Sequence, residues 1–315
     1  MRARFKRRLP IAFLSLLGLS AILGCAKPSA YKAPVATFRD ASILVIQTTQ
    51  TYLTQLNKVE RDNYIYQHAS AIQQIKLDEI QKEQIFSTDG IDARLSALDQ
   101  LSQYTSLLYQ LSTSDAPDTL TTEATNLQTA VTGLETQIHG LTGGDDSRFK
   151  TAAAGAFPIL GEILSQIAQH QLEAALKDAI AKGAEPVNTL ISAIESDATI
   201  AYQRKRTAES AARVIAIDQY NREFLGGKDP DKLKAYADAI SAEEDRWEAF
   251  GTAQPTAGLE SMKAANTALV TFARTPRPNI HDIGSLADAM NSFASTALRL
   301  STAVQALLNK NQGGM

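Results

Sequence analysis

The sequence predicts an all-α protein, an elongated antiparallel bundle of long helices. Apolar residues recur at alternating steps of three and four, which is the period of a helix packed along one side. The chain is rich in Ala, Leu, Gln, Ser and Thr, and only 6% of it is aromatic. Glycine and proline gather at a few places, and no segment has a convincing period-two pattern. This composition is typical of long helices rather than of an enzyme built on a sheet.

Three stretches carry the helical period most clearly. Such seams suit the near-parallel packing of helix bundles, in which each helix buries one stripe. The seam residues are Leu120, Ala124, Leu127, Val131, Leu134, Ile138 and Leu141 in the first stretch, Leu233, Tyr236, Ile240, Glu243, Trp247 and Phe250 in the second, and Ile283, Leu286, Met290, Phe293, Ala297, Leu300, Val304 and Leu307 in the third. Glu243 is the one lapse among them.

Turn-forming residues divide the chain between the expected helices. A first helix is expected from near Val35 to a break at 87–90, a length of about 50 residues or roughly 75 Å. Residues 114–117 offer cap residues followed by a proline in a first helical turn. Further breaks are expected at 143–146, 183–186, 226–230, 254–255 and 276–278.

Several of these landmarks coincide at an offset of 138 residues. Tyr64 falls on Tyr202 and Pro117 falls on Pro255 without gaps. The coincidence favours two tandem, similar helical units, residues 35–182 and 183–315. The alternative is one continuous bundle whose hairpins have similar lengths.

Residues 1–24 have the parts of an export signal. Five basic residues and no acidic residue stand in 1–8, an apolar stretch covers 9–23, and a small residue ends it. The apolar stretch is shorter than the roughly 20 residues of a spanning helix. We therefore expect removal of 1–24 as a signal peptide. Residues 25–34, with two prolines, are expected to form a short extended tether.

The end of this segment reads Ile22-Leu23-Gly24-Cys25. It resembles the lipobox of bacterial lipoproteins, a family that more often has leucine at the place of Ile22. The resemblance implies cleavage after Gly24 and lipidation of Cys25, the only cysteine of the chain. Because Ala26 follows in place of the aspartate of inner-membrane retention, it also implies an outer-membrane protein facing the periplasm in a Gram-negative host. The alternative is an ordinary signal peptide or a retained anchor, in which Cys25 is incidental.

The charge of the mature chain limits its partners. Removal of residues 1–24 takes away five positive charges and changes the formal net charge from −3 to −8. An acidic chain of this kind argues against nucleic acid and anionic lipid surfaces as main partners. The lipid bilayer is expected to be contacted through the acyl chains on Cys25. With that residue lipidated, no thiol remains for a disulfide, a metal or a nucleophile.

Two segments of the mature chain are candidates for binding. Arg204, Lys205 and Arg206 form a basic cluster that we interpret as a possible docking site for an acidic partner or anionic envelope glycans. The alternative is a solvated helix face. Residues 151–167 are the most apolar part of the mature chain, and either pack as a core helix or insert into a bilayer or a partner. The need of a long bundle for a fully buried helix favours the core.

The sequence contains no set of residues typical of catalysis, a metal or a cofactor. Ser147 and Lys150 match the Ser-x-x-Lys pattern of some acyl-enzyme hydrolases, but the companion motifs are absent. The histidines have neither the Glu-x-x-His nor the His-Glu-x-x-His spacing of metal sites, and are expected to be surface pairs or single buried residues; they are His68, His139, His170 and His281. A phosphate-cradling glycine loop is also missing.

These observations favour a non-catalytic binding or scaffold lipoprotein that docks another component of the cell envelope. The alternative is a small-ligand sensor or carrier with a site between helices, for which the conceivable lining residues are Tyr52, Tyr64, Tyr66, Tyr202 and Trp247. A third hypothesis is an enzyme acting on envelope polymers through carboxylates brought together by folding.

Overall fold

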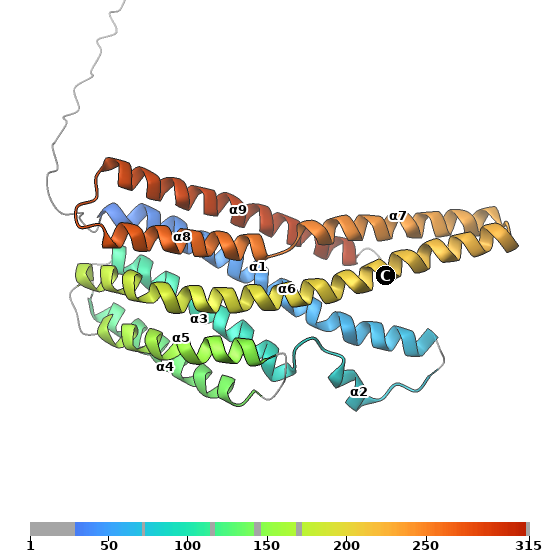
Figure 1. Ribbon diagram of the computed structural model, residues 1–315, viewed down its shortest axis with the longest axis horizontal. Helices are drawn as coiled ribbons and strands as arrows, with labels where there is room; N and C mark the ends of the chain where they lie inside the picture. The colour runs from blue at the N-terminus through green and yellow to red at the C-terminus, as the bar shows by residue number, and fades with distance from the viewer. Residues whose placement is uncertain (1–28, 71–72, 114–116, 142–145, 168–171, 313–315) are drawn as a thin grey trace, which may run out of the picture.

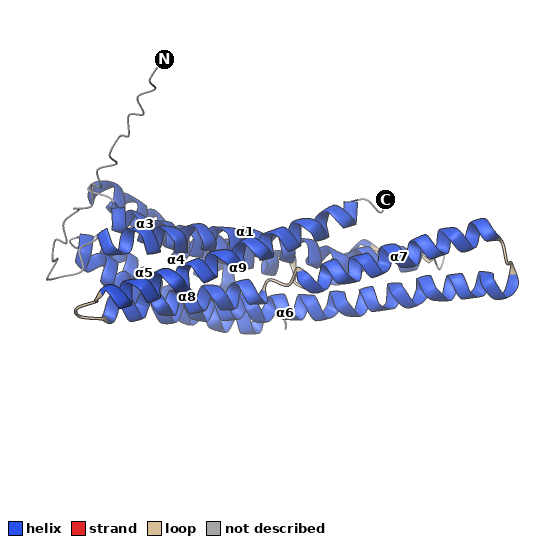
Figure 2. Ribbon diagram, turned by 90° about the horizontal axis from the view of Figure 1, so that it is seen from above, coloured by secondary structure: helices blue, strands red, loops and turns tan. Residues whose placement is uncertain are grey.

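A computed structural model of the chain describes residues 29–70, 73–113, 117–141, 146–167 and 172–312. Within these ranges the secondary structure is helical and contains no strand (Figure 2). The prediction of an all-α bundle with long helices is therefore confirmed. The expected signal peptide and Cys25 lie outside the described residues.

The described helices lie side by side along one long axis (Figure 1). Helix α1 packs against α3 and α9, α5 lies between α4 and α6, and α8 lies between α6 and α9. The helices are α1 (Ser29–Ser70), α2 (Leu77–Lys82), α3 (Thr88–Thr113), α4 (Pro117–His139), α5 (Ser147–Ile167), α6 (Leu172–Gly226), α7 (Pro230–Thr252), α8 (Thr256–Arg274) and α9 (Ile280–Gln312).

Two of the predicted seams are core seams of the bundle. All seven seam residues between Leu120 and Leu141 are buried, and so are the seam residues of α9 from Leu286 to Leu307. The first residue of that last seam, Ile283, is exposed because it lies at the start of α9. The apolar segment 151–167 also packs in the core, but it is not the fully buried helix expected, since one face of it is exposed and Ile159 is 41% exposed. No described helix has the length and hydropathy needed to cross a membrane.

The expected extended tether is wrong for residues 29–34, which belong to α1. The helix begins at Ser29 and contains Pro34. Tyr31 is fully buried, with its ring edge-on to that of Phe272 at a centroid distance of 5.0 Å. Burial of a large aromatic ring offsets the hydrogen bond that a proline removes near the start of a helix.

The first helix is shorter than the roughly 50 residues expected. Helix α1 ends at Ser70, and the short helix α2 precedes the polar stretch 87–90. That stretch begins a helix rather than ending one. The Ser87 hydroxyl accepts a hydrogen bond from the Gly90 N–H at 3.0 Å, and the Ser87 carbonyl accepts one from the Ile91 N–H at 2.8 Å. Serine at this position satisfies N–H groups that the first turn leaves unpaired.

The expected break at 183–186 is also wrong, because α6, a helix of 55 residues, continues through it. Val187 and Leu190 are fully buried just beyond Pro186, so packing of this stretch outweighs the local preference for a turn. The expected boundary between residues 182 and 183 falls inside this helix, and one core cluster contains residues of both halves. Duplication of a helical unit stays a prediction.

The second half of α6 leaves the bundle and forms a two-helix hairpin with α7 (Figures 1 and 2). We call residues 203–252 the arm. At its tip, the N–H groups of Gly227 and Lys228 both donate to the Glu223 carbonyl, and Lys228 has a positive φ of 53°. Asp229 caps α7 by accepting the Asp231 N–H at 3.0 Å. Helix α1 begins at the end of the bundle opposite this tip (Figure 1).

Candidate partner-binding site

The arm joins the bundle at a stack of two aromatic rings. Tyr202 of α6 lies nearly parallel to Phe250 of α7 at a centroid distance of 4.8 Å, and Phe250 is buried. Beyond this stack, the predicted α7 seam faces α6 but is only partly buried. Glu243, the polar lapse in that seam, accepts a hydrogen bond from Arg246 at 2.8 Å. The arm is thus a helical pair with little core of its own.

The basic cluster predicted at the arm lies at its base, but its three side chains diverge around the helix. Successive residues of a helix are turned by about 100°, so three in a row cannot share one face. Lys205 is partly buried and forms an ion pair with Glu209 of the same helix. Arg204 and Arg206 are exposed. The guanidinium group of Arg206 lies over the ring of Trp247, 5.5 Å from its centroid.

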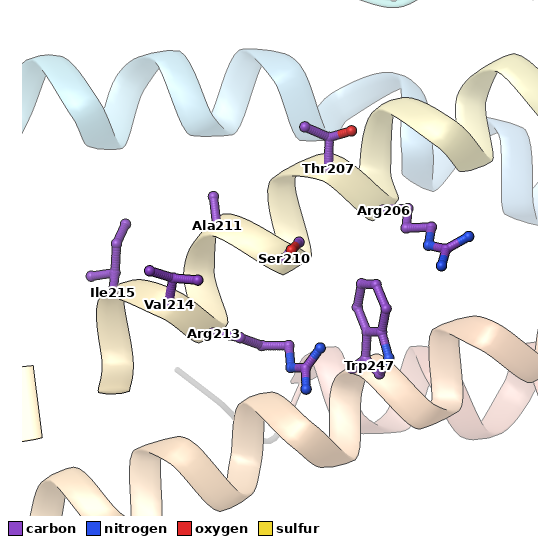
Figure 3. Close-up of a pocket in the computed structure, with 8 residues that line it drawn as sticks. All are labelled: Arg206, Thr207, Ser210, Ala211, Arg213, Val214, Ile215 and Trp247. Carbon is purple, nitrogen blue, oxygen red and sulfur yellow. The ribbon is translucent and has the colours of Figure 1, made fainter. Parts of the chain in front are cut away.

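Trp247 marks an open groove of about 750 Å³ along α6. Figure 3 shows Arg206 and Arg213 on either side of the indole ring. Arg213 forms two hydrogen bonds with the Glu244 carboxylate, at 2.8 and 2.7 Å, and lies 4.7 Å from the ring centroid. The lining residues are Arg206, Thr207, Ser210, Ala211, Arg213, Val214, Ile215 and Trp247.

The groove combines a cation with an apolar surface. Glu244 neutralises Arg213, so the charge that remains for a partner is that of Arg206. Two hydroxyl groups, from Thr207 and Ser210, lie beside it, and the groove continues over Val214 and Ile215. An arginine next to aliphatic and aromatic side chains suits a partner that places a carboxylate beside an apolar side chain. Sequence reasoning missed Arg213, although its spacing from the basic cluster by seven residues indicates a shared helical face.

The other aromatic candidates do not form one cavity. Tyr52 is buried in the bundle, and Tyr202 belongs to the stack at the base of the arm. The Tyr64 hydroxyl donates to Glu79 at 2.6 Å, near the far end of α1. The side chain of Tyr66 lies outside the described residues. Of the four predicted lining residues whose side chains the structure describes, only Trp247 borders the groove.

The Ser-x-x-Lys pattern holds two helices together. Lys150 donates to the carbonyl oxygens of His139 at 2.7 Å and Leu141 at 3.2 Å, at the end of α4. A lysine in this position satisfies carbonyl groups that the last helical turn leaves unpaired. The Lys150 amine is therefore engaged by backbone carbonyl groups and is not placed as a base for Ser147.

The described histidines lie apart from one another. His68 approaches the Tyr64 carbonyl at 2.9 Å, His139 lies 4.0 Å from Glu135, and His281 lies on α9. His170 lies outside the described residues. Among the residues that the structure describes, no three His, Cys, Asp or Glu side chains are placed to hold a metal ion.

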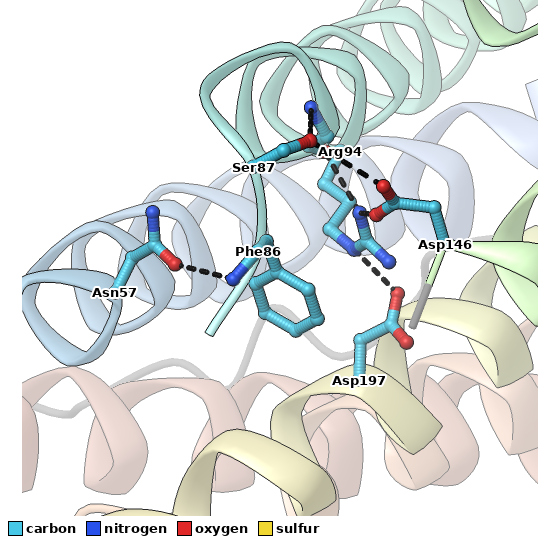
Figure 4. A network of polar contacts seen from close by, with 7 residues as sticks. Asn57, Phe86, Ser87, Arg94, Asp146 and Asp197 are labelled. Atoms are coloured by element: carbon cyan, nitrogen blue, oxygen red, sulfur yellow. Dashed lines mark hydrogen bonds and ion pairs between the residues drawn. The ribbon is translucent and has the colours of Figure 1, made fainter. Parts of the chain in front are cut away.

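A second polar cluster, which the sequence analysis missed, lies inside the bundle (Figure 4). Arg94 of α3 is 0% exposed and joins three elements. Its Nη1 donates to Asp146 at 2.7 Å and to the Gly90 carbonyl at 2.8 Å, and its Nε donates to Asp197 of α6 at 2.7 Å. We call Arg94, Asp146 and Asp197 the buried triad.

The surroundings of the buried triad fit the guanidinium group closely. It lies over the rings of Phe86 and Phe149, 3.9 and 4.9 Å from their centroids. The Phe86 N–H donates to Asn57 of α1 at 2.8 Å. A Cβ at Gly90 would lie 2.6 Å from an Asp146 oxygen, so glycine is required for this approach. The cluster therefore connects α1, α3, α5 and α6.

The charges of the buried triad do not balance. Two carboxylates face one guanidinium group, and Asp197 Oδ1 has no hydrogen-bond partner among the described residues. Burial raises the pKa of Asp197, although Arg94 acts in the opposite direction. All three side chains are buried, so the triad serves the packing of helices rather than a ligand. The sequence signal that could have indicated the buried triad is a charged residue in an apolar helical stripe, namely Arg94 between Ile91 and Leu98.

Comparison with protein families, with curated proteins and with solved structures finds no match for this chain.

Proposed function

We propose that this chain is a lipid-anchored scaffold protein of the bacterial cell envelope, which docks another envelope component without catalysis. The observation that carries the proposal is the arm. It is a two-helix projection with exposed apolar side chains and a basic groove at its base. Apart from Phe250 at its base, the arm adds no large buried apolar side chain to the bundle core, and a projection of this kind suits contact with another molecule.

The position of the arm supports this proposal. The expected lipidation site, Cys25, precedes α1, and α1 begins at the end of the bundle opposite the arm tip (Figure 1). Helix α6 alone would span roughly 80 Å at 1.5 Å per residue. A chain anchored on the periplasmic face of the outer membrane would thus hold its arm away from the membrane. Its groove would be open to envelope proteins.

Arg206 and Thr207 are the residues we assign to partner contact. An exposed arginine beside an indole ring binds a carboxylate without first breaking an ion pair, because its cation–π contact is compatible with a further hydrogen bond. The groove surface from Ala211 to Ile215 provides apolar contact next to it. We expect the partner to offer an acidic residue flanked by apolar side chains.

Site-specific crosslinking in cells tests this proposal. A photoreactive residue replaces Thr207 in the lipidated chain, and the matched control carries it at Thr129, an exposed threonine of α4 on the bundle. We expect a defined adduct with one envelope protein at Thr207 and none at Thr129. Recovery of the same proteins at both positions, or of none above an anchor-only control, would count against docking through the groove.

The small-ligand carrier remains a second candidate, because the groove contains the only tryptophan of the chain. Any ligand bound there changes the environment of Trp247 directly. A fluorescence screen of the purified protein against anionic envelope metabolites is therefore specific to this site. A response that Arg206→Glu abolishes would favour the carrier. A flat response across the screen would exclude these metabolites as ligands of the groove.

A further inference from the structure

The outer half of the arm leaves large apolar side chains in contact with water. Val214 and Ile215 are 55% and 53% exposed, and Phe224 and Leu225 near the tip are 53% and 77% exposed. Ile217 lies between them and is also exposed. A pair of helices cannot bury both sides of each helix, so a large part of the surface of these side chains stays uncovered in the single chain. Exposed apolar patches of this kind mark surfaces for association.

Helix α7 has small residues on a face turned away from α6. Ala235, Ala239 and Ala242 are exposed and follow one another at steps of four and three, which places them on one helical face. Alanine lets a second helix approach closely, and it accommodates larger side chains from that helix. The bulky α6 surface and the small α7 surface are therefore complementary in shape.

The two helices of the arm carry opposite charge. Residues 203–226 contain five basic and three acidic residues, a net charge of +2. Residues 230–252 contain six acidic and three basic residues, a net charge of −3. An acidic helix lying across the arm would be attracted by α6 and repelled by α7, and a basic helix would meet the reverse. A second copy of the arm satisfies both helices at once.

We propose that two copies of this chain pair through their arms, with α6 of each copy against α7 of the other, and form a four-helix bundle. The 23 residues of α7 give a length of about 35 Å, and two helices are roughly 20 Å wide, so pairing along the whole arm would bury at most about 700 Å² per copy. That is slightly less than the roughly 800 Å² per partner of a standard interface. Anchoring of both copies on one membrane raises their effective concentration, so that a smaller interface is sufficient for pairing.

The pairing does not involve Arg206, which lies at the base of the arm. It covers the middle and the tip of the arm, and it shares Val214 and Ile215 with the outer end of the groove. The outer end of the arm projects beyond the other helices (Figures 1 and 2). Ile215 lies near the middle of the arm, where the two copies of a symmetric pair come closest whichever way the arms run.

Cysteine crosslinking of the full chain in cells tests the pairing. The parent chain has no cysteine besides Cys25, so a cysteine introduced at Val214 or Ile215 reports on one place. With a short bis-maleimide we expect a homodimer of about twice the mass of the uncrosslinked chain, verified with two differently tagged copies. Its yield should exceed that of Thr129→Cys on α4 by about tenfold, because a bound neighbour has a far higher effective concentration than a colliding one.

A second variant examines which helices meet. Ala239→Arg places a long charged side chain on the small face of α7 and lowers helix propensity only slightly. In the Ile215→Cys chain it should abolish most of the dimer while far-UV circular dichroism is unchanged. Retention of the dimer would overturn the pairing of α6 with α7.

The remaining outcomes are also decisive. Equal crosslinking of Thr129→Cys and Ile215→Cys, or no dimer from either arm position, would overturn the pairing. An adduct at Ile215 with a different protein would overturn it too, yet would support the docking function. A dimer at Ile215 without an adduct at Thr207 would support the pairing and count against docking. The two proposals can therefore fail separately.

Discussion

Replacement of Arg94 by methionine is expected to destabilise the bundle more than replacement of any exposed arginine. In the native protein the guanidinium group makes 2.7 Å contacts with both Asp146 and Asp197, away from water. Methionine has a similar length and fills the space between the two phenylalanine rings. The substitution therefore removes charge and hydrogen bonds with little loss of volume.

The cost follows from what remains buried. Without Arg94, the two carboxylates lose the guanidinium group that contacts both of them, and breaking a buried ion pair in this way costs about 3–5 kcal/mol. In a protein of this size, 1 kcal/mol corresponds to a change of roughly 2–4 °C in melting temperature, so Tm should fall by roughly 10 °C. Protonation of the carboxylates would relieve part of the cost, and the loss should therefore be smaller near pH 4 than at pH 7.

Thermal and urea unfolding, followed by circular dichroism at 222 nm, measure this loss. Arg222→Met is the matched control, because Arg222 is exposed on the arm and hydrogen-bonds only to the carbonyl oxygen of Asp218. Exposed substitutions of this kind change stability by about 0.5 kcal/mol or less. A loss below about 1 kcal/mol for Arg94→Met at pH 7 would refute the role assigned to the buried triad.

Three further predictions concern other parts of the chain. Burial raises the pKa of Asp197 in the folded state above its ordinary 3.8, so between the two pKa values the folded protein binds more protons than the unfolded chain. The stability of the parent relative to Asp197→Asn should therefore fall as pH rises through this window. Urea unfolding at several pH values measures this change. Gly258→Ala should cost about 1–3 kcal/mol, since its Cβ would lie 2.6 Å from Leu300, whereas Gly251→Ala, whose Cβ meets nothing within 4 Å, should cost nothing in the same melts. Cys25→Ser should move the protein from the membrane pellet to the soluble fraction, and tight retention would contradict the lipid anchor.

The helical seams of the bundle were predictable because their physical cause is local. A stripe at steps of three and four has to be covered, and the residues from Leu120 to Leu141 are buried accordingly. The same argument gave the α7 seam and its lapse at Glu243. Prediction failed where tertiary packing outweighed a local preference, as at Pro34 and Pro186, both of which lie inside helices. Helix propensity is a weak prior that burial overrides.

The candidate site was predictable only in part. The cluster from Arg204 to Arg206 correctly indicated the base of the arm. It did not indicate that only Arg206 borders the groove, or that Arg213 and Trp247 complete the lining. Those contacts depend on the register between α6 and α7, which no local pattern gives. Asp146 follows residues that read as a turn, and its contact with Arg94 spans 52 residues. A charge in an apolar stripe indicates a buried partner but not which one.

The most direct test of docking compares the Thr207 crosslink in two versions of the lipidated chain. One has Arg206, and the other carries Arg206→Glu, which reverses the charge of the groove while leaving the bundle unchanged. We expect the envelope-protein adduct at Thr207 to fall by about tenfold or more, because a charged hydrogen bond contributes about 1.5–3 kcal/mol. An adduct of unchanged yield in the Arg206→Glu chain would contradict the assignment of this groove as the docking site.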